Sequence, residues 1–183
     1  MSSIRLSISA AIGFLLFVLP QCKKDKFNPS LPPITSIGAN TFGCKIDGKV
    51  FVPRDGRGKP GLFVQYEYLG TGVGGGWFLN IPAIDWASSA LTAVNIATDS
   101  LLVTEGISYQ IGRKKGMVSA FCMRGINSSS ADTYNKLDTD TGSLYIQRFD
   151  QVNHIISGQF SFSATDINGQ KVTITDGRFD IQY

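Results

Sequence analysis

The chain has 183 residues, of which 17 are Lys or Arg and 14 are Asp or Glu, for a net charge of +3. The basic residues are scattered, with the tightest cluster at Arg113-Lys114-Lys115, which excludes the broad basic stripe of a nucleic-acid-binding protein. His154 is the only histidine and no G-x-S-x-G motif occurs, so we expect no catalytic triad, no metal site and no cofactor.

Residues 1–21 predict a secretory signal peptide. Arg5 precedes the almost wholly apolar run Leu6–Leu19, which is shorter than the roughly 20 residues of a membrane-spanning helix. Pro20 ends the predicted helix, because it lacks a backbone N–H and clashes with the preceding turn. Cys22 follows almost at once.

Leu19-Pro20-Gln21-Cys22 resembles a lipobox, and the CKKDK junction that begins at Cys22 resembles that of many Bacteroidota lipoproteins. The resemblance implies cleavage before Cys22 and acylation of its thiol and its new amino group. It places the protein in the cell envelope, lipid-anchored in the outer membrane and facing either the periplasm or the cell surface. The alternative interpretation is an ordinary signal peptide with a chance cysteine.

Residues 22–40 carry Pro29, Pro32 and Pro33 and show little apolar periodicity, which predicts an extended tether between the lipid and a folded domain. We expect that domain to span residues 41–183, a length sufficient for a single hydrophobic core.

Short segments of alternating apolar and polar residues fill the domain and are separated by turn residues. Tight hairpin turns are predicted at Asp47-Gly48, Asn168-Gly169 and Asp176-Gly177. The predicted strands are 41–46, 49–52, 62–69, 77–81, 91–97, 107–112, 117–123, 143–149, 156–164 and 171–175, with a last one around Phe179 and Ile181. The pattern predicts an all-β fold, a single antiparallel sandwich or barrel of about ten strands.

Two segments lack a clear strand pattern. Pro82–Ala90 fits either a turn or a short helix around Trp86. Gly125–Thr141 is rich in Ser, Asn, Asp and Thr, which predicts a long polar loop or a disordered insertion and makes it a candidate partner site.

The blocks TFGCKIDGKVFVP (Thr41–Pro53) and IISGQFSFSATDINGQKVTITDGRFDI (Ile155–Ile181) resemble an uncharacterised family of small Bacteroidota lipoproteins. That family opens with a TFGC-type hairpin and closes with ISGxFxF and ITxGxFD strands. The resemblance implies an all-β lipoprotein domain and implies no activity.

Cys44 and Cys122 remain as a pair once Cys22 is lipidated. In an oxidising compartment they are candidates for a disulfide. The alternative is two buried free thiols, which pack as small core residues.

Four aromatic residues around the glycine-rich segment 70–76 are the candidate ligand-binding residues: Tyr66, Tyr68, Trp77 and Trp86. Sugars stack on exposed aromatic faces, so a glycan-binding module is one hypothesis. The alternative is that these rings form part of the core, as aromatic residues at strand spacing usually do.

Weaker patterns point to three further sites. Gly70–Gly76 resembles a phosphate loop, but a strand follows it rather than a helix, which favours a hairpin loop. Asp138 and Asp140 resemble the opening of a calcium loop, with two solvated turn aspartates as the alternative. Asp99-Ser100-Leu101 resembles a Bacteroidota O-glycosylation site at Ser100.

These observations predict a non-catalytic envelope domain with a binding or structural role. Its expected partners are the membrane, through the lipid, and a glycan, a small ligand or another envelope protein. A hydrolase acting on an envelope or glycan substrate is the second alternative, which would require two carboxylates, or His154 with an acid, in a cleft.

Overall fold

The computed structural model describes residues 27–126, 129–135, 137 and 140–183; the predicted signal helix and Cys22 lie outside them. Every regular element of the described chain is a β-strand, which confirms the all-β prediction. The strands are β1 (Thr41–Ile46), β2 (Lys49–Phe51), β3 (Gln65–Tyr68), β4 (Trp77–Ile84), β5 (Leu91–Thr98), β6 (Ser108–Gln110), β7 (Val118–Gly125), β8 (Ala131–Asn135), β9 (Gly142–Asp150), β10 (Ile155–Thr165) and β11 (Lys171–Gln182). None of the described residues belongs to a helix long and apolar enough to cross a membrane.

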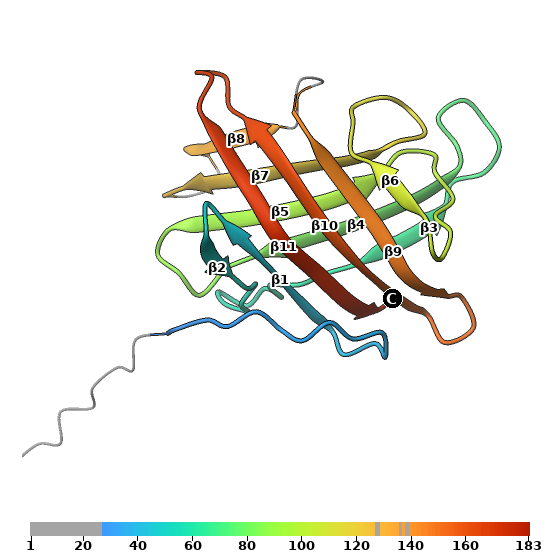
Figure 1. The fold of residues 1–183 in the computed structure, drawn as a ribbon, viewed down its shortest axis with the longest axis horizontal. Helices are drawn as coiled ribbons and strands as arrows, with labels where there is room; N and C mark the ends of the chain where they lie inside the picture. Colours follow the sequence, from blue (N-terminus) through green and yellow to red (C-terminus); the bar gives the residue numbers. More distant parts are fainter. Residues whose placement is uncertain (1–26, 127–128, 136, 138–139) are drawn as a thin grey trace, which may run out of the picture.

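The strands form two layers that cross each other (Figure 1). One layer has the order β2-β1-β11-β10-β9-β6 and the other the order β8-β7-β5-β4-β3. Strand β10 joins them, because it pairs with β9 along residues 155–162 and with β8 at Thr165, opposite Asn135. The hydrogen-bonded order ends at β2 and β3, so the described sheet is open and the fold is a sandwich rather than a closed barrel.

The hydrophobic core fills the space between the two layers. Ile156, Phe160 and Ile174 come from one layer, and Leu79 and Ile96 come from the other. The predicted inward face of β10, which alternates from Ile156 to Ala164, is buried as expected. Burial of these apolar surfaces is the main force that holds the layers together.

The first predicted hairpin is confirmed. Asp47 and Gly48 have φ angles of 48° and 78°, the left-handed values that a tight hairpin turn between β1 and β2 requires. Asp47 also accepts a hydrogen bond at 2.9 Å from the backbone N–H of Thr173, which ties the turn to β11.

The predicted hairpin turn at Asp176-Gly177 is wrong, because both residues lie inside the single strand β11. Phe160 pairs with Gly177 and Phe162 pairs with Ile174, so one residue of β10 faces two residues of β11. This is a β-bulge, and Asp176 has the left-handed φ of 52° within it. An Asp-Gly pair supplies the same backbone freedom to a turn and to a bulge, which explains the error.

Two segments are more ordered than the sequence predicts. Strand β8 lies inside the predicted polar loop Gly125–Thr141 and pairs with β7. Strand β4 extends through Pro82 to Ile84, where the sequence predicts a turn or a short helix. The Pro82 carbonyl accepts a hydrogen bond from Phe63 N–H at 3.2 Å. Because proline has no N–H, its carbonyl oxygen is the only backbone group of Pro82 that can form a hydrogen bond.

The predicted tether is wrong for residues 27–40, which we call the N-terminal strap. The strap lies along the sandwich instead of extending away from it (Figure 1). Asp180 of β11 accepts hydrogen bonds from Thr35 Oγ1 at 2.6 Å and from Gly38 N–H at 2.7 Å. A Cβ added at Gly43 would lie 2.5 Å from Pro32 Cδ, so β1 and the strap are in close contact.

Candidate ligand-binding site

Three of the four predicted aromatic residues come together at one end of the β3–β4 hairpin. Tyr68 pairs directly with Trp77 across the two strands, and Tyr66 lies two residues away on the same face of β3. The rings of Tyr66 and Trp77 stack with centroids 4.8 Å apart and planes 12° apart. Tyr68 lies against Trp77 at 5.1 Å. Alternation along β3 therefore places both tyrosines beside the tryptophan.

The C-terminal third of the chain adds further rings to this cluster. Tyr183 meets Tyr66 edge to face at 5.3 Å, and Phe149 meets Tyr66 in the same way at 5.2 Å. His154 contacts Tyr183 with ring centroids 5.5 Å apart. The backbone N–H of Tyr183 donates to the carbonyl of His154 at 2.7 Å, which holds the chain end in place.

These residues enclose a hollow of about 460 Å³ that we call the aromatic hollow, lined by Tyr66, Trp77, Gln151, His154 and Tyr183. Its volume falls within the range of small-molecule sites. The rings of Tyr66, Trp77 and Tyr183 are half-buried, and neighbouring Tyr68 is 49% exposed. The alternative interpretation was that these rings form part of the core. The rings are instead only partly buried.

The aromatic hollow contains two buried tyrosine hydroxyls. The hydroxyl of Tyr183 has no hydrogen-bond partner in the described structure, whereas the hydroxyl of Tyr66 makes no hydrogen bond of ordinary geometry but interacts with the side chain of Gln151. Burial raises the pKa of Tyr66 to about 12, and the neighbouring Tyr183 contributes to the rise. Burial raises the pKa of Tyr183 as well, with a smaller contribution from the charge of Asp150. Both phenols are therefore neutral at pH 7, and each has a proton to donate.

The turn that carries Gln151 and His154 is organised by Asp150. Its carboxylate accepts hydrogen bonds from Asn153 Nδ2 at 2.8 Å and from Arg148 Nη2 at 2.6 Å. Hydrogen bonds from Asn153 and then from Arg148 hold the pKa of Asp150 well below its usual range. Asp150 thus holds the turn in place through these hydrogen bonds, while the side chains of Gln151 and His154 stay exposed.

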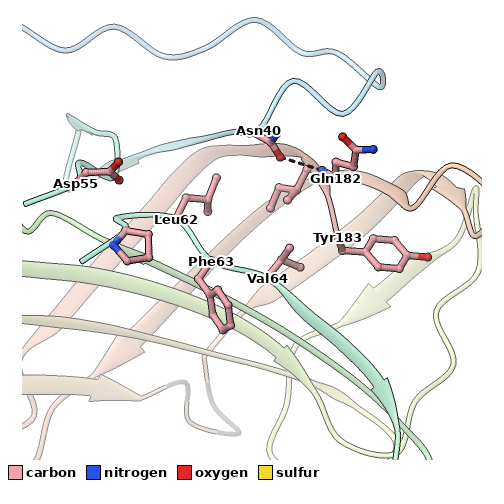
Figure 2. Close-up of a pocket in the computed structure, with 9 residues that line it drawn as sticks. Asn40, Asp55, Leu62, Phe63, Val64, Gln182 and Tyr183 are labelled. Carbon is pink, nitrogen blue, oxygen red and sulfur yellow. Dashed lines mark hydrogen bonds between the residues drawn. The ribbon is translucent and has the colours of Figure 1, made fainter. Parts of the chain in front are cut away.

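A second hollow of about 480 Å³ adjoins the first and shares Tyr183 with it (Figure 2). Leu62 and Val64 point toward the end of β11, while Phe63 points to the other side. Asn40 closes one end, where its side-chain oxygen accepts a hydrogen bond from Gln182 N–H at 3.0 Å. Tyr183 is the one lining residue that the two hollows share.

Trp86 does not line the aromatic hollow, and its role in ligand binding stays a prediction. Its indole Nε1 donates to the carbonyl of Pro60 at 3.0 Å, and Lys59 Nζ lies 4.7 Å from its ring centroid. The adjoining ion pair between Arg54 and Asp85, at 2.6 Å, fixes the loop around it. This separate cluster lies beside the N-terminal strap, where Arg54 also covers the ring of Phe27.

Cys44 and Cys122 are free, fully buried thiols in the core, so the candidate disulfide is not formed in this structure. Burial, followed by the proximity of Cys122, raises the pKa of Cys44 far above its ordinary value. Burial raises the pKa of Cys122 to about 12. The pair therefore packs as small apolar residues.

The remaining candidates have structural partners. Ser100 Oγ donates to the carbonyl of Gly75 at 2.6 Å, so its hydroxyl is engaged, and O-glycosylation there stays a prediction. Segment 70–76 connects two strands, as the hairpin interpretation expects. Asp140 accepts from Leu137 N–H and pairs with Lys171 at 3.2 Å, whereas Asp138 lies outside the described residues. Burial opposes ionisation of Asp140, but these bonds hold its pKa below the ordinary value.

No group of three or more His, Cys, Asp or Glu residues within the described chain could hold a metal ion. The aromatic hollow offers ring faces for stacking and hydroxyl, amide and imidazole groups for hydrogen bonding. No family model, no curated protein and no solved structure matches this chain.

Sequence reasoning missed Gln151, Tyr183 and the role of His154 in this site. The period-two pattern of β11 contains a usable signal for one of them, because Phe179 and Ile181 face inward and Tyr183 continues the same face. Gln151 and His154 lie in a polar turn, and nothing local relates that turn to β3.

Proposed function

We propose that the chain is a lipid-anchored cell-envelope protein whose β domain binds a glycan in the aromatic hollow without transforming it. The anchor rests on the sequence around Cys22. The ligand class rests on one observation, the meeting of the half-buried rings of Tyr66, Trp77 and Tyr183 beside exposed polar side chains.

The chemistry of a sugar ring matches this surface. The C–H face of a pyranose is apolar and packs on an aromatic ring, whose large area supplies most of the contact energy. The sugar hydroxyls around that face need hydrogen-bond partners, and Gln151 and His154 stand at the edge of the hollow. The aromatic rings can pack on the apolar face of the sugar, and the polar side chains can bond its hydroxyls. This combination favours a glycan over a purely apolar ligand.

The unpartnered phenol of Tyr183 adds to the case. A buried hydroxyl without a hydrogen bond costs about 1–3 kcal/mol of stability. The free domain has one at Tyr183, beside the Tyr66 hydroxyl, which interacts with the Gln151 side chain. A ligand that reaches the Tyr183 hydroxyl therefore gains a hydrogen bond that the free protein lacks.

Two other functions receive less support. A carrier needs an empty interior, whereas buried side chains of both layers pack into one core cluster. A hydrolase needs a free acid in the site, and Asp150, whose charge acts on Tyr183, is bound to Arg148 and Asn153. Binding without catalysis is the function that this geometry favours.

A glycan screen tests the proposal, with immobilised oligosaccharides of glucose, mannose and N-acetylglucosamine as probes. Wild type and the matched control Trp86→Ala are expected to bind the same glycans. Trp77→Ala is expected to lose about tenfold or more in affinity, because it removes the stacked ring of the hollow. Equal binding by Trp77→Ala and wild type, or no binding to any probe, contradicts the proposal.

A further inference from the structure

The N-terminal strap is hydrogen-bonded to the domain at Thr35 to Gly38, and at its start the ring of Phe27 lies against Arg54. Asp180, only 1% exposed, accepts hydrogen bonds from Thr35, Ile37 and Gly38 of the strap at 2.6 to 2.9 Å. A carboxylate buried in this way is satisfied only while the strap stays in place.

A second set of contacts holds the strap at Ser36. Its carbonyl accepts from Arg148 Nη1 at 2.6 Å, and its hydroxyl accepts from Ser157 Oγ at 2.9 Å. The strap is therefore bound to β9, β10 and β11, and it does not act as a spacer.

The fastened strap leaves little free chain between the domain and the proposed lipid. From Cys22 to Phe27 the chain advances by five residues, which span at most about 18 Å when fully extended. The end of the sandwich at which the strap begins must therefore stay close to the bilayer, if Cys22 carries the lipid.

The surface around Phe27 has the composition of a membrane-facing surface. Phe27 is 53% exposed, and Arg54 lies 4.0 Å from its ring centroid. Lys49 and Arg124 line the adjoining pocket. Aromatic and basic side chains together favour the interface of a bilayer with anionic head groups.

The charges at this end are unevenly paired. Arg54 and Arg124 are neutralised by Asp85 and Asp47. Among the described residues, no carboxylate pairs with three further cations at this end: Lys49, Arg57 and Lys59. Arg57 donates to the carbonyl of Ser88 at 3.1 Å and Lys59 lies over the ring of Trp86, so these charges are not neutralised by a carboxylate and can attract lipid phosphates.

We propose that this end of the sandwich, with Phe27, Lys49, Arg57, Lys59 and Trp86, lies on the anionic phospholipid head groups of the membrane that holds the anchor. This inference rests on the proposed lipidation of Cys22. The turn between β9 and β10, which borders the aromatic hollow, lies at the opposite end of the molecule from the start of the strap (Figure 1). The hollow thus faces away from the bilayer, where a glycan can reach it.

The two tryptophans of the chain report on the two ends separately. Trp77 lines the aromatic hollow and Trp86 packs against Lys59 in the proposed membrane surface. We would reconstitute the lipidated protein, as Trp77→Phe and as Trp86→Phe, into phosphatidylethanolamine–phosphatidylglycerol vesicles with brominated acyl chains. The Trp77→Phe variant reports on Trp86, and the Trp86→Phe variant reports on Trp77. We expect the fractional quenching by bromine to be about twofold or more greater for Trp86 than for Trp77.

Charge reversal provides a second test in the Trp77→Phe variant, in which Trp86 is the remaining tryptophan. Lys49→Glu with Lys59→Glu is expected to reduce Trp86 quenching, because anionic lipids repel the new carboxylates. The matched control is Lys114→Glu with Lys115→Glu in the basic turn before β7, which is expected to leave quenching unchanged. Equal quenching of the two tryptophans, or equal effects of the two charge reversals, overturns the inference.

Flotation of the vesicles separates this inference from the anchor on which it rests. Protein that fails to float contradicts lipidation itself. Protein that floats with Trp86 unquenched contradicts only the orientation. Trp86 that is unquenched by bromine yet shielded from aqueous acrylamide indicates a protein partner on this surface, which also overturns the membrane assignment.

Discussion

Under the proposed function, Tyr183 serves ligand binding at the expense of stability. Its hydroxyl is buried without a partner, so the free domain bears a desolvation cost that a phenylalanine would not. Its ring meets Tyr66 and His154 at the same time, so the side chain also shapes the aromatic hollow. Selection for stability alone would favour phenylalanine at this position.

Tyr183→Phe is therefore expected to stabilise the free domain by about 1 kcal/mol and to weaken glycan binding. Urea denaturation measures the first effect, and titration with a bound glycan from the screen measures the second. Tyr145→Phe is the matched control, because its side chain is exposed on β9 and both quantities should remain unchanged. A Tyr183→Phe variant that is less stable than wild type would contradict the account of this hydroxyl.

At the scale of elements, most strands could be predicted from the sequence, because each follows from local alternation and turn chemistry. The β1–β2 hairpin and the inward face of β10 are examples. The predictions were wrong where tertiary contacts, rather than the local sequence, determine the structure. Strand β8 is polar, and pairing with β7 makes it a strand. The strap looks like a linker, and buried Asp180 fixes it.

The same division applies to the candidate site. Tyr66, Tyr68 and Trp77 could be predicted because β3 and β4 are neighbours in sequence and form a hairpin. Sequence proximity alone groups Trp86 with these residues. Because Trp86 follows the far end of β4, it lies instead beside the loop of Pro60. Tyr183 meets Tyr66, and His154 meets Tyr183, only because the two layers cross, which no local pattern encodes.

Asp180 allows the strap to be tested. Although burial acts to raise its pKa, hydrogen bonds from Thr35, Ile37 and Gly38 outweigh this and hold the pKa below the ordinary value. The stabilisation from this ionised group is therefore present above the unfolded pKa of about 3.9 and is lost as the pH falls toward the folded value. We expect the amide protection of Ile37 and Gly38 to fall in that range.

Asp180→Asn is expected to reduce the protection of the same amides at pH 7, at a cost of about 1.5–3 kcal/mol for hydrogen bonds to a charged group. Asp176→Asn on the same strand is the matched control, because that carboxylate is largely exposed and bonds Lys45 instead of the strap. Hydrogen exchange, corrected for intrinsic rates, measures both. Identical protection in the two variants would show that Asp180 does not hold the strap.

At the scale of the whole molecule, we propose a lipid at one end of the sandwich and a glycan-binding surface at the other. Thiol counting tests the lipid. Cys44 and Cys122 are buried with raised pKa values, so a thiol reagent is expected to label neither in the native protein. In denaturant without reductant we expect two reactive thiols, with Cys22 unreactive and its mass raised by acyl chains.

Each other outcome of that count has a definite meaning. Three reactive thiols, or an unmodified mass at Cys22, would contradict the anchor. No reactive thiol would show that Cys44 and Cys122 form a disulfide in the native protein, against the free thiols of this structure.

The most direct test of glycan binding in the aromatic hollow is the emission of Trp77 in the Trp86→Phe variant, titrated with a soluble glycan identified by the screen. We predict a saturable change in Trp77 emission at the same concentrations at which the glycan binds, because the sugar covers this ring. The Trp77→Phe variant, which reports on Trp86, should show no change. Binding that leaves Trp77 emission constant, or that alters Trp86 instead, would contradict the account.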